Sequence, residues 1–330
     1  MTSKNGNAHL QAAFSAADAK LFFTKNDSND QRLGDFVKPL DDLHLLTHEP
    51  DNYVIAGYPD DEGIRINGGR PGSACAPDEV RRYFYKMTPQ LFTEKATTPK
   101  LWDVGNLKVA DFEIQDRHEQ ASTTALLALT QGARWLSLGG GHDYGFADGK
   151  AFCEWCKTQG TTRPLVINFD AHLDVRPTTN GLSSGTPFFR LLEAYPDIDF
   201  AEIGIQSQCN SRTHYEWAKK RGARILTQEE IETSDEPMFT HVVRLLGDWI
   251  LRPRPVFLSI DIDGFSNAVA PGASQSWATG FLPKDFFQVF NLLRLRLDVR
   301  LLGIYEVSPP LDLDAQTAKL AAQIMHRLIG

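Results

Sequence analysis

The chain has 330 residues, of which 42% are hydrophobic and 23% are charged, and its formal net charge is −8. This length and apolar content allow one large α/β domain or two smaller ones with a sizeable core. The negative charge argues against a nucleic-acid partner, because phosphate binding requires a basic face. We find neither a secretory leader nor an apolar run of the roughly 18 residues that span a membrane, so we expect no membrane partner and a cytoplasmic location.

Residues 1–45 are predicted to form an N-terminal lead-in and extension, because small and polar residues dominate its beginning. The first strand is expected at residues 53–56. The stretch from 60 to 77 is rich in glycine and proline, which predicts an irregular loop. A helix is expected over residues 77–87, with Pro77 in its first turn and acidic residues directly after it.

Farther along the chain, apolar strands alternate with helical segments. The predicted strands cover residues 133–142, 164–170, 199–206, 223–227, 255–263 and 299–310. The predicted helices cover residues 122–132, 186–195, 213–222, 238–251, 284–296 and 314–329. Strands that are apolar nearly throughout and separated by helices indicate a parallel sheet covered on both faces. We therefore predict that residues 46–330 form one doubly wound α/β domain, with its ligand beyond the carboxyl ends of the strands.

Three of the predicted strands end in polar side chains that can bind metal. The residues concerned are His142, then Asp170, His172 and Asp174, and finally Asp261 and Asp263. Alternate positions on an extended backbone point the same way, so each set is expected to face one site. A single aspartate at a strand end is usually a cap or turn residue, and a single histidine is usually an ordinary hydrogen-bonded group. The conjunction of three segments at one sheet edge favours a metal site.

Charge balance indicates how many ions such a site would hold. Four carboxylates packed together would repel one another and raise one another's pKa. Two divalent cations balance that charge, and oxygen-rich ligation with a minority of imidazole suits Mn²⁺. Two ions about 3.5–4 Å apart can share a bridging water and convert it to hydroxide near neutral pH.

Two other motifs invite different interpretations. Gly139, Gly141 and Gly145 follow a strand, but their GxGxxxG spacing is not the GxGxxG of a dinucleotide site. We instead expect these glycines to let the backbone pass close to the metal cluster. Cys153 and Cys156 form a lone CxxC, which we interpret as two thiols on one helix rather than a redox pair or half a zinc site.

The segments "GGGHD", "NFDAHLDVR", "SGTPF", "SIDID" and "YEVSPP" together resemble the ureohydrolase superfamily, which includes arginase and agmatinase. The resemblance runs in order from Tyr53 to the C-terminus. It implies a three-layer α/β/α sandwich with a mostly parallel sheet, and two Mn²⁺ ions per subunit. It implies that one ion is held by His142, Asp170, Asp174 and Asp261. It implies that the other is served by His172, Asp170 or Asp174, Asp261 and Asp263, and which carboxylates bridge stays open.

Within this superfamily the chain is most similar to the formimidoylglutamase branch. Ser184 stands where arginases and agmatinases have a histidine before "G-x-P", so a titratable proton shuttle is lost. The Asp-Pro common after "SIDID" is replaced by "GFSNAVAPG". The resemblance thus implies hydrolysis of the C–N bond of N-formimidoyl-L-glutamate to L-glutamate and formamide, a step of histidine degradation. The implied roles are hydroxide attack at the amidine carbon, proton transfer by Asp174, and pairing of the cationic amidine with Glu306.

Two alternatives remain open. One is a hydrolase that releases urea from a guanidino compound such as guanidinobutyrate, agmatine or arginine. The other is a non-catalytic relative, against which the intact set of six ligands argues. In either enzyme the partner is a small amidine or guanidine substrate. The resemblance also implies a homo-oligomer, a trimer or hexamer.

An acidic substrate needs a cation in the site. Arg176 lies two residues past Asp174, and a guanidinium suits a carboxylate in bidentate geometry. Further candidates for substrate binding are Ser184, Arg190, Gln206, Asn210 and Ser211. The sequence leaves open whether the loop over residues 60–77 closes over the substrate.

Overall fold

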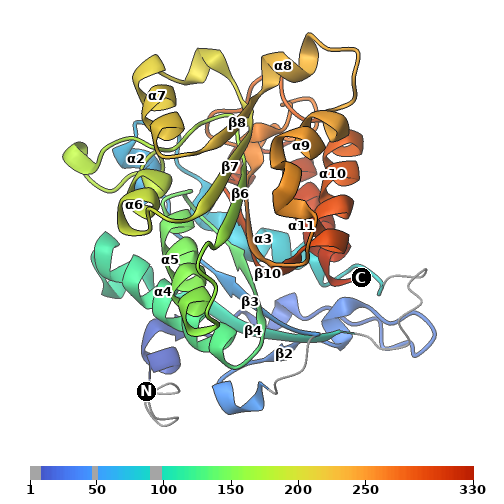
Figure 1. Cartoon of the computed structure of the whole chain (residues 1–330). Coiled ribbons are helices and arrows are strands. Elements are labelled where there is room, and N and C mark those ends of the chain that lie inside the picture. The colour runs from blue at the N-terminus through green and yellow to red at the C-terminus, as the bar shows by residue number, and fades with distance from the viewer. Residues whose placement is uncertain (1–8, 47–50, 90–98) are drawn as a thin grey trace.

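The structure, a computed structural model, describes residues 9–46, 51–89 and 99–330. In these residues ten strands form one sheet in the order β1-β4-β3-β5-β10-β9-β6-β7-β8, with β2 also paired to β4 (Figure 1). The strands are β1 (Phe14–Ser15), β2 (Lys38–Pro39), β3 (Asn52–Gly57), β4 (Lys100–Leu107), β5 (Arg134–Leu138), β6 (Leu165–Phe169), β7 (Asp199–Ile205), β8 (Arg224–Thr227), β9 (Pro255–Asp261) and β10 (Asp298–Tyr305).

From β3 to β8 along the sheet, neighbouring strands are parallel, and only β1 pairs with β4 in the antiparallel direction. The central strands are short apolar runs buried along their whole length, such as "LVINF" in β6. Parallel strands need cover on both faces, and that is why their sequences do not alternate between apolar and polar residues. The predicted mostly parallel sheet is confirmed.

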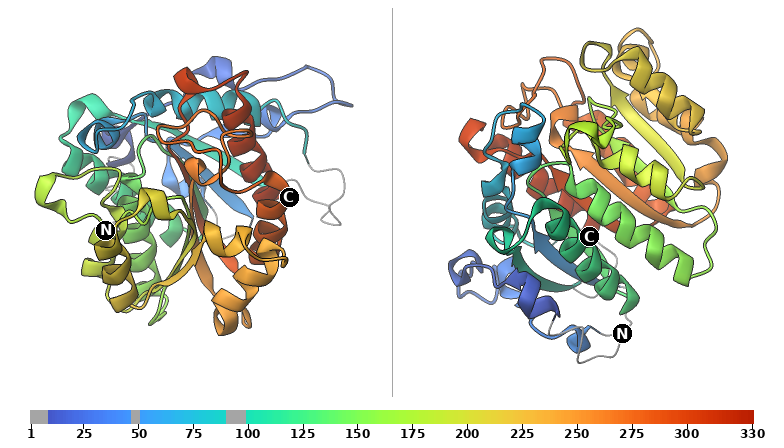
Figure 2. Two further views of the ribbon diagram at one scale, coloured as in Figure 1. Left: turned by 90° about the horizontal axis from the view of Figure 1, so that it is seen from above. Right: turned by 90° about the vertical axis from the view of Figure 1, so that its left-hand side faces the viewer.

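Helices cover both faces of this sheet. The helices are α2 (Glu62–Ile66), α3 (Ala76–Phe84), α4 (Ile114–Thr130), α5 (Tyr144–Thr158), α6 (Pro187–Ala194), α7 (Arg212–Lys220), α8 (Gln228–Glu232), α9 (Met238–Leu246), α10 (Pro283–Arg296) and α11 (Gln316–Ile329). Helices α4 to α7 lie on one face, as the right-hand view of Figure 2 shows, and α3, α9, α10 and α11 lie on the other. Within β6, Leu165 and Ile167 pack into one core layer while Val166 packs into the other. The three-layer sandwich is therefore confirmed.

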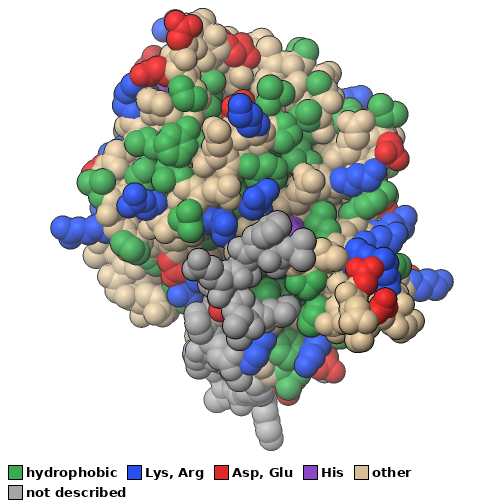
Figure 3. Space-filling view, turned by 90° about the vertical axis from the view of Figure 1, so that its right-hand side faces the viewer, with side chains coloured by type: hydrophobic (Ala, Val, Ile, Leu, Met, Phe, Trp, Pro, Cys, Tyr) green, Lys and Arg blue, Asp and Glu red, His purple; other side chains and the backbone are tan. Residues whose placement is uncertain are grey.

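The outer surfaces of the helical layers are mixed in character. On the side shown in Figure 3, hydrophobic, basic and acidic side chains are interspersed among the residues drawn in colour. Among the described residues, no helix is both long and apolar enough to cross a membrane. Both Cys153 and Cys156 are fully buried free thiols on α5, and burial raises the pKa of Cys156 to about 12.

Some elements differ from those predicted. Strand β4 was not predicted, because Asp103, Gly105 and Asn106 interrupt its apolar pattern. Asp103 is nevertheless buried, since the guanidinium of Arg81 donates to both of its carboxylate oxygens at 2.8 and 2.9 Å. Helix α4 begins eight residues earlier than expected. Inside the predicted irregular loop lies the short helix α2, and the N-terminal extension contributes β1 and β2 to the sheet.

The strand order determines where a ligand can bind. Strands β5, β10, β9 and β6 are neighbours and parallel, so their carboxyl ends meet at one edge of the sheet. The last residue of β9, Asp261, and the segments that follow these strands carry all the predicted metal ligands and Glu306.

Candidate metal centre and active-site cavity

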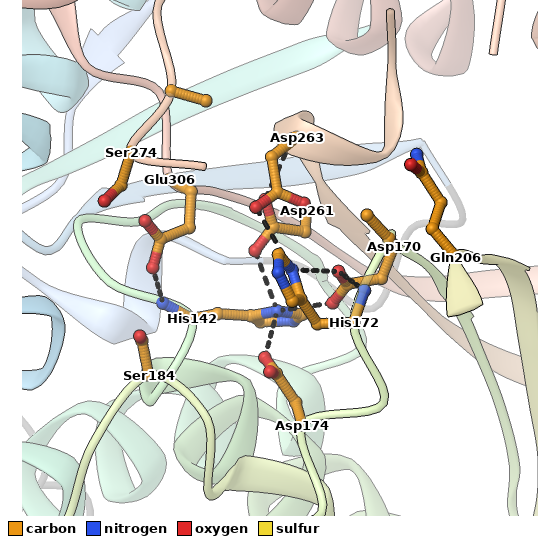
Figure 4. A network of polar contacts seen from close by, with 12 residues as sticks. His142, Asp170, His172, Asp174, Ser184, Gln206, Asp261, Asp263, Ser274 and Glu306 are labelled. Atoms are coloured by element: carbon orange, nitrogen blue, oxygen red, sulfur yellow. Dashed lines mark hydrogen bonds and ion pairs between the residues drawn. The ribbon is translucent and has the colours of Figure 1, made fainter. Parts of the chain in front are cut away.

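Six side chains from three of these segments converge (Figure 4). They form two groups whose potential ligand atoms lie within 4.8 Å of one another, and the groups share one aspartate. The first group comprises His142, Asp170, Asp174 and Asp261, and the second comprises Asp170, His172 and Asp263. The first ligand set expected from the sequence is thus brought together in full, and the second without Asp261.

The backbone that presents these side chains is not the extended strand we expected. Strand β6 ends at Phe169, so Asp170, His172 and Asp174 lie in an irregular segment. There, Oδ1 of Asp170 accepts a hydrogen bond from the backbone N–H of His172 at 2.7 Å. Asp174 then adopts a left-handed conformation, with φ of 49°. Tight turns, rather than alternation along a strand, therefore make these side chains converge.

The turn after β9 is built in the same way. Oδ1 of Asp261 accepts a hydrogen bond from the backbone N–H of Asp263 at 2.9 Å. In both turns one carboxylate oxygen fixes the backbone, and the other oxygen remains for the cluster. The glycines after β5 serve more than one contact. A Cβ on Gly145 would lie 3.0 Å from Cδ2 of His142, so this glycine gives a residue of the cluster room, as predicted. A Cβ on Gly140 would lie 1.6 Å from the backbone oxygen of Asp60, so this glycine admits a neighbouring loop rather than the metal cluster.

His142 lies at the centre of the first group. Its Nδ1 is 3.0–3.1 Å from one carboxylate oxygen each of Asp170, Asp174 and Asp261. This nitrogen is fully buried, yet it makes no well-directed hydrogen bond to any of them. The other ring nitrogen, Nε2, contacts the hydroxyl of Ser259 at 2.8 Å, and Tyr305 stacks on the ring with centroids 4.7 Å apart. The ring is therefore held so that Nδ1 faces the three carboxylates.

His172 occupies the second group. Its Nδ1 lies 3.5 Å from Oδ1 of Asp170 and 3.3 Å from Oδ2 of Asp263. The side chain of His172 is 21% exposed, whereas that of His142 is wholly buried. The second group is thus the one that opens toward solvent.

The electrostatics of the cluster are those of acids crowded together. Burial, together with the charge of Asp170, raises the pKa of Asp174 to about 6. Burial and the charge of Asp263 raise the pKa values of Asp261 and Glu306 well above their usual range. Burial alone would lower the pKa of His142, but hydrogen-bonding contacts with the three carboxylates raise it well above its usual value. These shifts reduce the net negative charge, as expected where cations would otherwise supply the balance. Asp170 is the exception, because burial would raise its pKa but the contacts with His142 and His172 lower it.

These residues fit a pair of divalent metal ions. The buried Nδ1 of His142 has no directed hydrogen-bond partner. One carboxylate oxygen each of three aspartates converges on the same point. Four carboxylates and two imidazoles form an oxygen-rich donor set, which suits Mn²⁺. Ser259 at Nε2 provides the second hydrogen bond that metal-binding histidines commonly make.

Glu306 borders the cluster from the end of β10. Its Oε1 accepts a hydrogen bond from the backbone N–H of His142 at 3.3 Å, and its φ is 64°. Figure 4 shows Ser184 and Ser274 near Glu306, on the side away from His172. The hydroxyl of Ser184 is within 3.2 Å of the amide nitrogen of Asn67, which donates to it.

A cavity of about 280 Å³ lies over the cluster and Glu306, which form its floor. Asp174, Asp261, Asp263 and Glu306 line it together with Arg176, Ser184 and Asn210, so three of the residues predicted to bind substrate reach the cavity. Arg176 is exposed, and its guanidinium makes no hydrogen bond or ion pair with the described residues. Its backbone N–H donates to the oxygen of Gly185 at 2.8 Å.

The structure places Arg190 and Gln206 elsewhere, and neither lines the cavity. The guanidinium of Arg190 donates to Nδ1 of His118 at 2.9 Å and stacks on Phe146. Its place on α6 directs it toward α4 and α5 rather than toward the metal cluster. Gln206 is buried, and its amide exchanges hydrogen bonds with Thr279. Both expectations are therefore corrected.

Asn210 lines the cavity, but its side chain is already used. Its Oδ1 accepts from the backbone N–H of Leu173, and its Nδ2 donates to the carbonyl oxygens of Ala171 and Gln206. These bonds fix the segment after β6 against the segment after β7. Asn210 is thus placed to support the ligand-bearing turn rather than to bind substrate.

Several lining residues were not predicted from the sequence, among them Asn67, His214, Ser274, Gln275 and Trp277. Asn67 follows α2 and His214 lies in the first turn of α7, and both elements lie beyond the sheet edge. The only available signal was general, namely that segments following parallel strands gather at a ligand site.

Comparison with known proteins identifies the family. Residues 51–330 match the model of the arginase family. This chain belongs to the arginase family. It is 30% identical over 304 residues to formimidoylglutamase from Clostridium tetani, covering 89% of this chain and 88% of the relative.

Solved structures of the arginase family share its fold. The crystal structure of Trypanosoma cruzi formiminoglutamase with Mn²⁺ aligns with a TM-score of 0.77 at 24% identity, covering 91% of this chain and 97% of that one. Formimidoylglutamase from Bacillus subtilis aligns with a TM-score of 0.77 at 23% identity, covering 98% and 97%. As a member of the arginase family with formimidoylglutamase relatives, the chain is a hydrolase acting on amidine or guanidino groups.

Proposed function

We propose that this arginase-family hydrolase cleaves N-formimidoyl-L-glutamate to L-glutamate and formamide, with two Mn²⁺ ions per subunit. The observation that carries this proposal is the guanidinium of Arg176, which has no partner among the described residues and lies in the same cavity as the buried acidic floor. A cationic amidine matches the floor and a carboxylate matches the guanidinium. Similarity to curated formimidoylglutamases over most of the chain supports the same substrate.

The chemistry that a bound metal pair supplies is activation of a shared water as the nucleophile near neutral pH. The protein's own residues orient the substrate. Glu306 lies at the cavity floor and accepts a backbone hydrogen bond through Oε1. Its carboxylate is positioned to pair with the amidinium, which turns the amidine carbon toward the cluster.

Asp174 is the residue we assign to proton transfer. Its carboxylate lines the cavity within the ligand cluster, where it can carry a proton between the nucleophilic water and the substrate. A proton held on a carboxylate oxygen of Asp174 passes to the substrate nitrogen as the C–N bond breaks. One water is consumed, its oxygen becomes the formamide carbonyl, and the nitrogen leaves as the amine of glutamate.

Ser184 separates this hydrolase from one that acts on arginine. Its hydroxyl accepts a hydrogen bond from Asn67 and does not titrate near neutral pH. We accordingly assign it to positioning at the cavity wall. Involvement in histidine degradation, a cytoplasmic location and a homo-oligomeric state remain part of the proposal.

A substrate panel tests the function. Protein loaded with Mn²⁺ would be incubated with N-formimidoyl-L-glutamate, guanidinobutyrate, agmatine and arginine, and assayed for formamide, glutamate, ammonia and urea. We expect formamide and glutamate in equal amounts from the first substrate. Urea from a guanidino compound without formamide would replace the proposed substrate. If no compound is hydrolysed and less than one metal ion is retained per chain, the protein is a non-catalytic relative.

A further inference from the structure

The cavity has two poles of opposite charge. At its floor lie the carboxylates of Asp174, Asp261, Asp263 and Glu306, all substantially buried. Arg176 lies at its rim, and the other polar residues that line it are mainly neutral amides and hydroxyls. A substrate that is cationic at one end and anionic at the other can therefore bind in only one direction.

Arg176 is held at the rim by close packing on Gly185. A Cβ at position 185 would lie 2.6 Å from Cδ and 3.0 Å from Nε of Arg176, so the absence of a side chain there makes room for the arginine stem. The backbone hydrogen bond between Arg176 and Gly185 fixes the same contact. The guanidinium is thus held in place while no acidic side chain among the described residues neutralises it.

A second nitrogen-bearing side chain lines the same cavity as this guanidinium. His214 comes from α7, lines the same cavity, and is half-buried. Its backbone N–H is capped by the hydroxyl of Ser211 at 3.2 Å, while its ring has no hydrogen-bond partner among the described residues. Burial, and then the charge of Arg176, lower the pKa of His214 below its usual value, which places the ring within electrostatic range of the guanidinium.

We propose that Arg176 and His214 together form an anion subsite that binds the carboxylate farthest from the amidine carbon, which in N-formimidoyl-glutamate is the γ-carboxylate. This subsite deepens the proposed function and rests on it. Arg176 offers two N–H donors in a planar fork, and His214 offers a third donor from a different element. The pair defines the substrate class as linear amidines with an anionic far end, and it rejects compounds such as agmatine whose far end is cationic.

The chemistry explains why one member of the pair is histidine. Two permanent cations side by side in an empty cavity would repel each other. A neutral imidazole can sit beside the guanidinium and still donate one N–H to a bound carboxylate. An anion bound between them stabilises any proton that the ring gains.

The test compares two matched ligands and four variants. N-formimidoyl-L-glutamine replaces the γ-carboxylate of N-formimidoyl-L-glutamate by a neutral amide of nearly the same shape. In the Mn²⁺-loaded enzyme, Arg176→Ala should raise KM for the acid about ten- to hundredfold, as for loss of a charged hydrogen bond. His214→Ala should raise it about three- to tenfold. In both variants kcat should change little, and KM for the amide should stay constant.

Two further variants control for structure and general charge. His214→Gln keeps an N–H donor and should restore most of the affinity lost in His214→Ala. Arg212 is an exposed cation on the same helix and does not line the cavity. Arg212→Ala should leave KM for the acid within about twofold of the wild-type value.

Binding of the product provides a readout without turnover. Calorimetry should show L-glutamate binding the wild-type protein more tightly than L-glutamine does, and this preference should disappear in Arg176→Ala and shrink in His214→Ala. The subsite is overturned if the acid and the amide lose affinity equally, or if His214→Ala changes neither KM nor glutamate binding. Failure of the proposed function is a different result, because then the wild-type enzyme hydrolyses neither amidine while the calorimetric preference still decides on the subsite.

Discussion

Two groups of acidic residues at opposite edges of the sheet are balanced in opposite ways. At the amino edge, Asp199 begins β7 and Asp298 begins β10. Asp199 is bound by Arg163 and Arg254, at 2.5 and 2.7 Å. Asp298 is bound by Arg134 and Arg300, at 2.8 and 2.6 Å. Each acid at this edge is neutralised by arginine from the protein itself.

In the cluster at the carboxyl edge no such neutralisation occurs. Among the described residues, the cluster aspartates pair only with His142 and His172, and no lysine or arginine forms an ion pair with them or with Glu306. A group of buried carboxylates without basic partners is costly unless a cation is supplied. The comparison distinguishes acids whose charge is balanced by arginine from acids whose charge would be balanced by a bound cation.

The largest expected effect is loss of the shared ligand. Asp170 belongs to both metal groups, whereas Asp263 belongs to one. We expect Asp170→Ala to bring activity below detection and to remove both ions. Asp263→Ala should also abolish activity but retain up to one ion. Metal analysis after Mn²⁺ reconstitution checks this, with Asp298→Ala from the other edge as the control that keeps its metal. Full metal content in both ligand variants would contradict the assignment.

The second effect concerns the hydrogen bond behind His142. Ser259→Ala should weaken Mn²⁺ affinity about 10–100-fold, as is usual when the outer partner of a metal-binding histidine is removed. Ser137→Ala is the matched control. Ser137 and Ser259 flank Gly303 at the same register of the sheet, but the hydroxyl of Ser137 donates to Asp148 instead of contacting His142. Equal metal affinity in the two variants would show that Ser259 does not orient the ligand.

Buried polar residues with distant partners also explain which parts of the fold could be predicted from the sequence. Strands such as β6 and β9 are continuous apolar runs and are predicted readily. Strand β4 is not, because its buried Asp103 looks like a loop residue until Arg81, 22 positions earlier, is seen to bind it. The first turns of α4 were missed for a similar reason, since "IQDRHEQ" is polar although His118 within it is buried against Asp143. Local pattern cannot reveal partners that are distant in sequence.

The candidate site was likewise predicted only in part. The metal-binding residues were predicted because each follows an apolar strand and the carboxyl ends of parallel strands meet. Their means of convergence was not, since the left-handed backbone of Asp174 has no sequence signal. Arg190 illustrates the opposite error. It follows a motif near the site, but its position on α6 turns its side chain toward His118. A motif alone does not specify which way a helical side chain points.

The third prediction concerns the amino edge. Asp199→Ala leaves Arg163 and Arg254 without their carboxylate, and should lower the free energy of unfolding by about 1–3 kcal/mol. Arg163→Ala should cost less, because Arg254 still binds Asp199. Urea denaturation measures both changes. Neither variant should alter Mn²⁺ content or kcat/KM, and a loss of metal in Asp199→Ala would mean that the two edges are not independent.

The smallest effect tests a third kind of buried acid, which has neither arginine nor metal. Asp148 on α5 is fully buried and accepts hydrogen bonds from the hydroxyls of Tyr58, Ser137 and Tyr305. Burial raises its pKa from 3.8 to about 6, although these hydrogen bonds oppose the rise. Because the folded state then binds a proton more readily than the unfolded state, this group makes the protein more stable as pH falls from 7 toward 5.

Asp148→Asn removes that titration while keeping the size of the side chain. The free energy of unfolding of the wild type, measured relative to Asp148→Asn at the same metal content, should rise by about 1 kcal/mol between pH 7 and pH 5. Chemical denaturation at the two pH values gives the difference, and the other titrating groups cancel because both proteins share them. A difference that is independent of pH would show that the three hydroxyls stabilise the ionised carboxylate as fully as arginine does at the amino edge. A rise in this free-energy difference toward pH 5 would show that hydroxyl donors offset only part of the cost of burying an ionised carboxylate. At the carboxyl edge the same cost favours metal binding.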